Sequence, residues 1–199
     1  MSCNKSITNS KKSSLKELII LYKQSLDSQG CLSPLYLDLN EVVDIKKKET
    51  TEIFLQRCVC NRKRHQYCLS NVAVDKAVSK LLTFQNIWSP RSNNFEELYD
   101  TIFNLIGKGK TGISYSTVYD TAIRIGWTFS PKIVPEEMVY VHLKLIKSAK
   151  CIFKNKLIIK DHCRIERDLF NKREPEFKKL SSLEIEDFLC VCHDELLKI

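Results

Sequence analysis

The sequence predicts an all-α fold, and three observations carry this prediction. Glycine and proline number five each among 199 residues, which leaves little material for the tight turns that join β-strands. Along most of the chain, apolar residues recur at three- and four-residue steps, the spacing of one face of an α-helix. Apolar runs such as residues 157–159 stay far below the roughly 20 residues that cross a bilayer. We therefore expect a soluble, helical protein without a membrane-spanning segment.

The predicted elements begin with residues 1–14, which hold lysines but no acid and are predicted as a disordered basic leader. A helix is predicted from Ser14 to Gln29, with Gly30 ending it. Its apolar residues fall on one face, namely Leu15, Leu18, Ile19, Tyr22 and Leu26. Between residues 33 and 43, leucines alternate with other residues, which indicates a loop or a short strand before a solvated turn at 45–48.

Helices are predicted over the rest of the chain at residues 52–60, 71–83, 95–105, 116–129, 136–150 and 182–197. Pro90 breaks the pattern before the third of these helices, and Asn94 is its predicted N-cap. Ser182 begins the last helix in a string that resembles a capping box, although Ile185 stands where the box has Glu or Gln. We interpret residues 15–199 as a single helical domain.

The balance of charge favours anionic partners. Lysine and arginine number 32 against 24 acids, which gives a formal net charge of +8 and biases the surface towards polyanions. Six lysines and no acid occur between residues 138 and 160, whereas residues 184–195 hold acids but no lysine or arginine. Nine cysteines, an odd number, and the lack of an apolar leader after Met1 predict free thiols in a reducing cytoplasm.

Residues 105–126 are predicted to form a helical hairpin. Gly107, Gly109 and Gly112 stand between two helical patterns, where they permit backbone angles that are closed to other residues. The next helix begins just after them, so its N-terminal amides and the positive end of its dipole lie beside the turn. A turn of this kind is suited to binding phosphate.

Residues 112–126 resemble the helix-hairpin-helix of DNA-repair glycosylases and nucleases. Over roughly residues 60–197 the chain also resembles a family of uncharacterised bacterial proteins with such a hairpin. The shared motifs, in order, are His65-Gln66, Thr-Val-Tyr-Asp-Thr-Ala at 117–122, Tyr140-Val141-His142, and Glu-Asp-Phe-Leu-Cys at 186–190. The resemblance implies a helical domain like that of the DNA glycosylases. Ser114 departs from it, because the hairpin usually has its second glycine there.

The glycosylase pattern places a catalytic aspartate after the hairpin helix, and in this sequence Tyr140 stands at that position. A tyrosine, whose pKa is about 10, cannot stabilise an oxocarbenium ion or activate water as a carboxylate does. We therefore do not expect base excision. The enzyme alternative is a divergent base- or nucleotide-processing activity that uses His65, Asp120, Tyr140 and His142. The polar residues expected to share one pocket are these four together with Tyr119 and Arg124.

No metal or other cofactor is expected. Cys58, Cys60, His65 and Cys68 offer soft ligands, but their spacing is tighter than that of the paired ligands in zinc sites. Residues 190–193 hold two further cysteines and a histidine, and a buried helix explains them better because cysteine packs as a small hydrophobe.

Taken together, these patterns predict a protein that binds the backbone of duplex DNA, rather than RNA, without reading its sequence. The predicted contacts come from the hairpin and a lysine-rich face, and comprise Lys108, Lys110, Gly112, Ile113, Ser114, Lys144, Lys147 and Lys150. A third hypothesis is a subunit that binds a protein partner and whose hairpin only connects two helices. Exposed lysines beside the hairpin favour DNA binding, a shared polar pocket favours an enzyme, and burial of Gly112 favours an interaction subunit.

Overall fold

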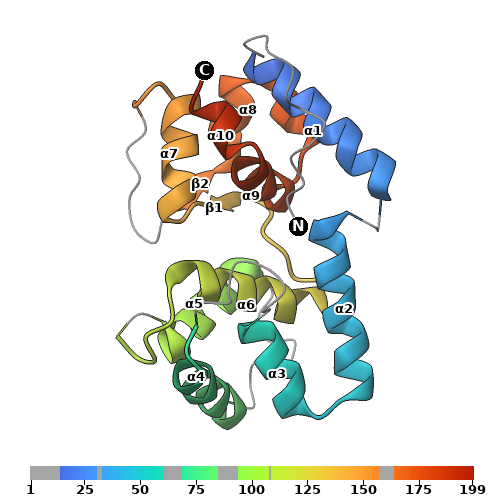
Figure 1. Cartoon of the computed structure of the whole chain (residues 1–199), viewed down its shortest axis with the longest axis vertical. Helices are drawn as coiled ribbons and strands as arrows, with labels where there is room; N and C mark the ends of the chain where they lie inside the picture. The colour runs from blue at the N-terminus through green and yellow to red at the C-terminus, as the bar shows by residue number, and fades with distance from the viewer. Residues whose placement is uncertain (1–13, 31–32, 61–68, 85–93, 108, 157–163) are drawn as a thin grey trace.

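A computed structural model describes residues 14–30, 33–60, 69–84, 94–107, 109–156 and 164–199. The elements in chain order are α1 (Leu15–Gln29), α2 (Pro34–Lys48), α3 (Thr51–Val59), α4 (Asn71–Thr83), α5 (Phe95–Ile106), α6 (Tyr115–Trp127), β1 (Met138–Tyr140), α7 (Leu143–Ile152), β2 (Arg164–Glu166), α8 (Arg167–Arg173), the 3-10 helix η3 (Pro175–Lys179), α9 (Ser182–Val191) and α10 (His193–Leu196). Helices dominate, which confirms the predicted mostly helical class, and the described residues contain one two-stranded sheet (Figure 1). No helix in these ranges is both long and apolar enough to cross a membrane.

The elements form two lobes, each with its own core (Figure 1). The central lobe contains α2 to α6, and its core includes Phe54, Tyr99 and Ile102. The terminal lobe brings together α1 and the elements from β1 onwards around residues such as Phe170. Helix α2 follows α1 along the chain and runs into the central lobe, and its Tyr36 packs against both cores. The two lobes are therefore in direct contact through α2.

Short-range signals in the sequence set where most helices begin. The side chains of Ser14, Thr50, Ser70 and Asn94 each accept a backbone N–H from the first turn of the helix that follows. The helices predicted at these four positions are confirmed, because the bounds of α1, α3, α4 and α5 differ from the predicted ones by at most one residue.

The prediction of a loop or short strand followed by a turn at 33–48 is wrong, because this segment forms helix α2. Ser33 caps the helix, and a proline occupies its first position, where a missing N–H breaks no helical bond. Leu35 and Leu39 are buried one turn apart, whereas Leu37 between them is 48% exposed. The alternating leucines thus belong to one buried helical face plus one exposed position, and not to the two faces of a strand.

The single helix predicted at 136–150 is also wrong, because strand β1 and the shorter helix α7 occupy this segment. β1 pairs antiparallel with β2 and lies at the seam between the lobes. Val139 and Val141 are buried in the core of the terminal lobe, whereas Tyr140 is buried in the core of the central lobe. An extended strand directs successive side chains to opposite faces, so it can contribute to both cores at once.

The segment 182–197, predicted as one helix, forms two helices, α10 and before it α9, which begins the segment. Its N-cap is Ser181 and not Ser182: the Ser181 hydroxyl accepts the Glu184 N–H at 3.2 Å, and the Glu184 carboxylate accepts the Ser181 N–H at 2.7 Å. The capping box is therefore complete and lies one residue earlier than predicted. The Ser182 hydroxyl instead donates to the Glu136 carbonyl, which ties α9 to the segment before β1.

Candidate functional site

The glycine-rich turn, residues 107–114, connects α5 to α6. Gly109 and Gly112 have φ values of 89° and 82°, in the left-handed region that favours glycine, and a Cβ at either position would meet no atom within 4 Å. Ile113 is fully buried, and the Thr111 hydroxyl donates to a carbonyl of α5 at 2.6 Å. The turn is thus anchored at its base, while Gly109 and Gly112 stay open to solvent.

Ser114 ends the turn and caps α6. Its φ of −76° and ψ of 162° are extended angles that any residue adopts, so this position does not need the glycine that the resemblance would place there. The Ser114 hydroxyl accepts the Thr117 N–H at 3.3 Å, which satisfies one N-terminal amide of α6. A bound anion would therefore contact the backbone of the turn and the first-turn N–H groups of α6 that Ser114 does not satisfy.

Three of the predicted DNA-binding lysines are exposed: Lys110 on the turn, and Lys147 and Lys150 on α7. The opposite side of α7 is fixed inside the terminal lobe, where the buried Ser148 hydroxyl lies 2.7 Å from His193 Nδ1. Lys108 and the side chain of Lys144 lie outside the described part of the structure.

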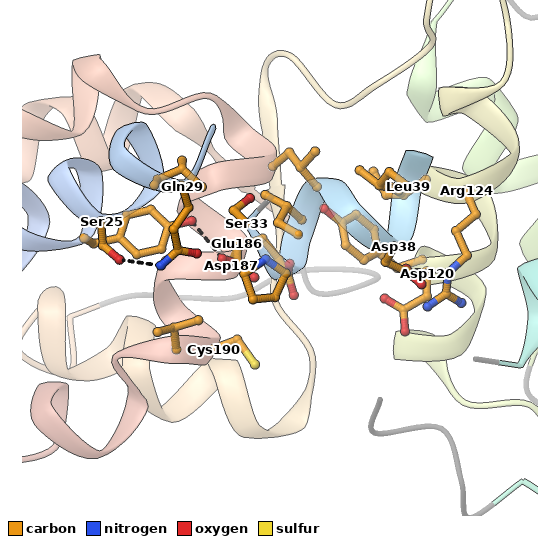
Figure 2. Close-up of a pocket in the computed structure, with 18 residues that line it drawn as sticks. Ser25, Gln29, Ser33, Asp38, Leu39, Asp120, Arg124, Glu186, Asp187 and Cys190 are labelled. Atoms are coloured by element: carbon orange, nitrogen blue, oxygen red, sulfur yellow. Dashed lines mark hydrogen bonds and ion pairs between the residues drawn. The ribbon is translucent and has the colours of Figure 1, made fainter. Parts of the chain in front are cut away.

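A second candidate site is a pocket of about 240 Å³ among α1, α2, α6 and α9, where the two lobes meet (Figure 2). Much of its wall is apolar and includes Leu26, Leu35, Leu39, Ile123 and Leu183. The charged side chains among its described lining residues are four carboxylates and one guanidinium, from Asp38, Asp120, Glu186, Asp187 and Arg124. The pocket is therefore acidic, in a chain whose net charge is +8.

Arg124 forms the cationic part of the pocket wall. Its Nε donates to Asp38 Oδ2 at 2.9 Å, and its Nη1 donates to the Cys58 carbonyl at 2.8 Å. Asp120, one helical turn before Arg124 in α6, adds its negative charge to that of Asp38. Arg124 is only 2% exposed, so this buried ion pair joins α2 to α6 at one end of the pocket.

Tyr119 and Asp187 both line this pocket. Asp187 Oδ2 accepts the Tyr22 hydroxyl at 2.8 Å. The Tyr119 hydroxyl is buried and has no hydrogen-bond partner among the described residues. Burial first, and then the negative charges of Glu186 and Asp120, raise the pKa of Tyr119 well above its usual value. The hydroxyl stays protonated and lies within the electrostatic influence of the acidic side chains of the pocket.

Tyr140 lies behind Tyr119 in an aromatic cluster. The two rings stack with centroids 5.0 Å apart, and Tyr140 also contacts the rings of Phe95 and Tyr99. Its hydroxyl likewise has no hydrogen-bond partner within the described ranges, but Tyr140 is not among the residues that line the pocket. Tyr140 is therefore a core residue of the seam between the lobes.

The structure brings together only part of the predicted polar pocket. Tyr119, Asp120 and Arg124 line the pocket. His142 is instead half-buried at the N-cap position of α7, and His65 lies outside the described residues. Sequence reasoning missed Asp38, because its segment was not predicted to be helical. Glu186 and Asp187 could have been found from the sequence, since they belong to the Glu-Asp-Phe-Leu-Cys motif.

The described cysteines form no disulfide bond; they are Cys58, Cys60, Cys151, Cys190 and Cys192. Burial raises the pKa of Cys58 well above its usual range and that of Cys192 to about 12, so both thiols stay protonated and unreactive. No three side chains of the His, Cys, Asp or Glu type lie together as a metal site in the described ranges. Cys68 and His65 fall outside these ranges.

Comparison of the chain with models of known protein families, with curated proteins and with solved structures finds no significant match.

Proposed function

We propose that this protein binds the backbone of duplex nucleic acid, DNA in particular, through the glycine-rich turn and the exposed lysines of α7. The observation that carries the proposal is the pair of open glycines. Gly109 and Gly112 leave free space on the surface of the turn, where a phosphate can approach backbone N–H groups closely. Helices α5 and α6 pack together and are joined by this turn, which supports our proposal that the three form a helix-hairpin-helix.

The distribution of charge supports this proposal. Lys110 lies on the turn itself, and α7 carries Lys147 and Lys150 with no acidic residue along its length. In Figure 1 the turn and α7 both lie on the left-hand side of the view, one in each lobe. Lysines near phosphates release condensed counterions, which gives affinity without sequence preference.

Two observations favour DNA binding over the other hypotheses. Gly112 is exposed, whereas a hairpin that serves only as a connector in an interaction subunit would bury it against another helix. Tyr140 is buried among aromatic rings, and burial raises its pKa above the usual range, so it supplies no charge to a base-excision reaction. We therefore propose binding without base excision.

Changing both Lys147 and Lys150 to Gln is expected to make DNA binding less dependent on salt. If each lysine lies near one phosphate, the slope of log affinity against log salt should fall by about 2 × 0.9, or roughly 1.8. The measurement is a titration of a short duplex across a salt series. The matched control changes Lys47 and Lys48 to Gln; these lysines are exposed on the last turn of α2, in the other lobe, and their loss should leave the slope close to that of the parent.

Gly112→Ala separates the contribution of the turn from that of the lysines. A side chain at a φ of 82° is strained, so binding should weaken, while the salt slope should stay near the parent value because no charge is removed. Circular dichroism checks that the variant remains helical. A parent protein that shows no affinity for DNA at about 50 mM salt, where electrostatic binding is strong, would contradict the proposal.

A further inference from the structure

The pocket between the lobes has features that DNA-backbone binding does not use. It is enclosed by four elements, its described lining residues carry three more negative than positive charges, and no lysine is among them. A phosphate backbone would be repelled from such a site. The pocket must therefore be explained separately from the glycine-rich turn.

We propose that this pocket binds a small organic cation, an alkylguanidinium, whose planar head lies among Tyr119, Asp187 and Glu186 and whose alkyl chain contacts the apolar wall. The proposal goes beyond nucleic-acid binding and does not depend on it. The pocket residues of α6 begin at Tyr119, in the second turn of the helix, and the rest of the site comes from α1, α2 and α9.

The Tyr119 hydroxyl is the observation that points to a ligand. It belongs to a residue that is only 3% exposed and lines the pocket, and no described group pairs with it. A buried hydroxyl without a partner is energetically unfavourable, so a bound group that hydrogen-bonds to it would remove that cost. The acidic side chains of Glu186, Asp120 and Asp187 all act electrostatically on this hydroxyl. A positively charged hydrogen-bond donor suits both the hydroxyl and these acids.

A guanidinium fits these acceptors better than a metal ion. It offers five N–H donors in one plane, is weakly hydrated, and can therefore bridge separated oxygens in a partly apolar site. Metal ions need several ligands around one point, and the described side chains do not form such a cluster. The pocket already holds one guanidinium in this way, because Arg124 donates to Asp38 at one end.

The size and walls of the pocket limit the ligand. A volume of about 240 Å³ is below the range of about 300–1,000 Å³ that is usual for drug-sized ligands. Leu26, Leu35 and Leu183 supply apolar surface, which suits a short alkyl chain. Two sources have this chemistry: a free alkylguanidine and the side chain of an arginine residue in a peptide.

The test is isothermal titration calorimetry on the full chain with n-butylguanidinium and with its neutral isostere n-butylurea. We expect butylguanidinium to bind and butylurea to bind at least tenfold more weakly, because only the cation is attracted by the carboxylates. N-acetylarginine methylamide distinguishes the two sources. Equal binding of this compound indicates a peptide arginine, and much weaker binding indicates a free small molecule.

Matched variants locate the binding. Asp187→Asn keeps an oxygen for the Tyr22 hydroxyl but removes a charge, so we expect about tenfold weaker binding of butylguanidinium. Asp194→Asn, at an exposed position of α10 that does not line the pocket, should have no effect. Tyr119→Phe should weaken binding about fivefold. Tyr140→Phe removes an equally buried hydroxyl from the stacked ring outside the pocket and should leave binding unchanged.

Three results would overturn the proposal: no heat of binding at about 1 mM butylguanidinium, equal binding of butylurea, or an equal effect of Tyr119→Phe and Tyr140→Phe. Thermal unfolding of each variant shows whether it is folded, and the two phenylalanine variants preserve the aromatic packing. Calorimetry with butylguanidinium tests the pocket, whereas DNA titration of the parent tests the proposed function. The two proposals can therefore fail independently, since the lysine variants leave the pocket intact.

Discussion

Asp38→Ala is expected to lower the free energy of unfolding by about 3–5 kcal/mol. The Asp38 carboxylate and the Arg124 guanidinium are 8% and 2% exposed, and they are joined by a hydrogen bond of 2.9 Å. Loss of the carboxylate removes the acceptor of Arg124 Nε and one negative charge from beside a buried cation. The nearby charge of Asp120 offsets part of the loss, so we expect the lower half of this range. Urea denaturation followed by circular dichroism measures the effect.

The control for Asp38→Ala lies on the same helix. Glu41 pairs with Arg57 at 2.6 Å, but its carboxylate is 40% exposed, so Glu41→Ala should cost less than about 1 kcal/mol. The double variant Asp38→Leu with Arg124→Met removes both charges and should recover most of the lost stability. An Asp38→Ala protein within about 1 kcal/mol of the parent would show that the pair does not stabilise the contact between α2 and α6.

Gly126→Ala is expected to destabilise the central lobe by about 3 kcal/mol, the upper end of the usual cost of overpacking. A Cβ at this position would clash with the Ile133 carbonyl oxygen, and that oxygen belongs to backbone that cannot rotate away. The same two residues are joined by a hydrogen bond of 3.0 Å from the Ile133 N–H to the Gly126 carbonyl. The end of α6 and the following segment therefore approach each other as closely as glycine permits.

Gly112→Ala provides the comparison for Gly126→Ala, because the space around it is open and only its backbone angle resists a side chain. We expect a loss of about 1–2 kcal/mol at Gly112 and a larger loss at Gly126, measured by the same urea denaturation. The reverse order would mean that the segment after α6 shifts easily to accommodate a methyl group.

One helix carries both proposed sites. The first residues of α6 follow the glycine-rich turn, whereas Tyr119, Asp120 and Arg124 contribute to the pocket one to three turns later. The sequence predicts that these residues lie on one helix, and the resemblance to the glycosylase hairpin covers the same residues. Neither indicated that α1, α2 and α9 would close a pocket over it.

The sequence by itself determined the helices whose signals act over a few residues. Ser14 and Asn94 cap the helices that follow them, and the apolar faces of α4 and α5 repeat within one or two turns. The glycine-rich turn was also predictable, because three glycines within six residues permit backbone angles that helices exclude. These features depend on hydrogen bonds and sterics between neighbouring residues, and such interactions are visible in a single sequence.

The tertiary structure alone decided the strand and the pocket. The segment 138–140 is extended because cores lie on both of its sides, so that Tyr140 and Val139 are buried in different lobes. The acidic groups of the pocket include Asp38, Asp120 and Asp187, each separated from the next by more than sixty residues. Their convergence depends on how the lobes pack, and packing over such separations leaves no periodic pattern in the chain.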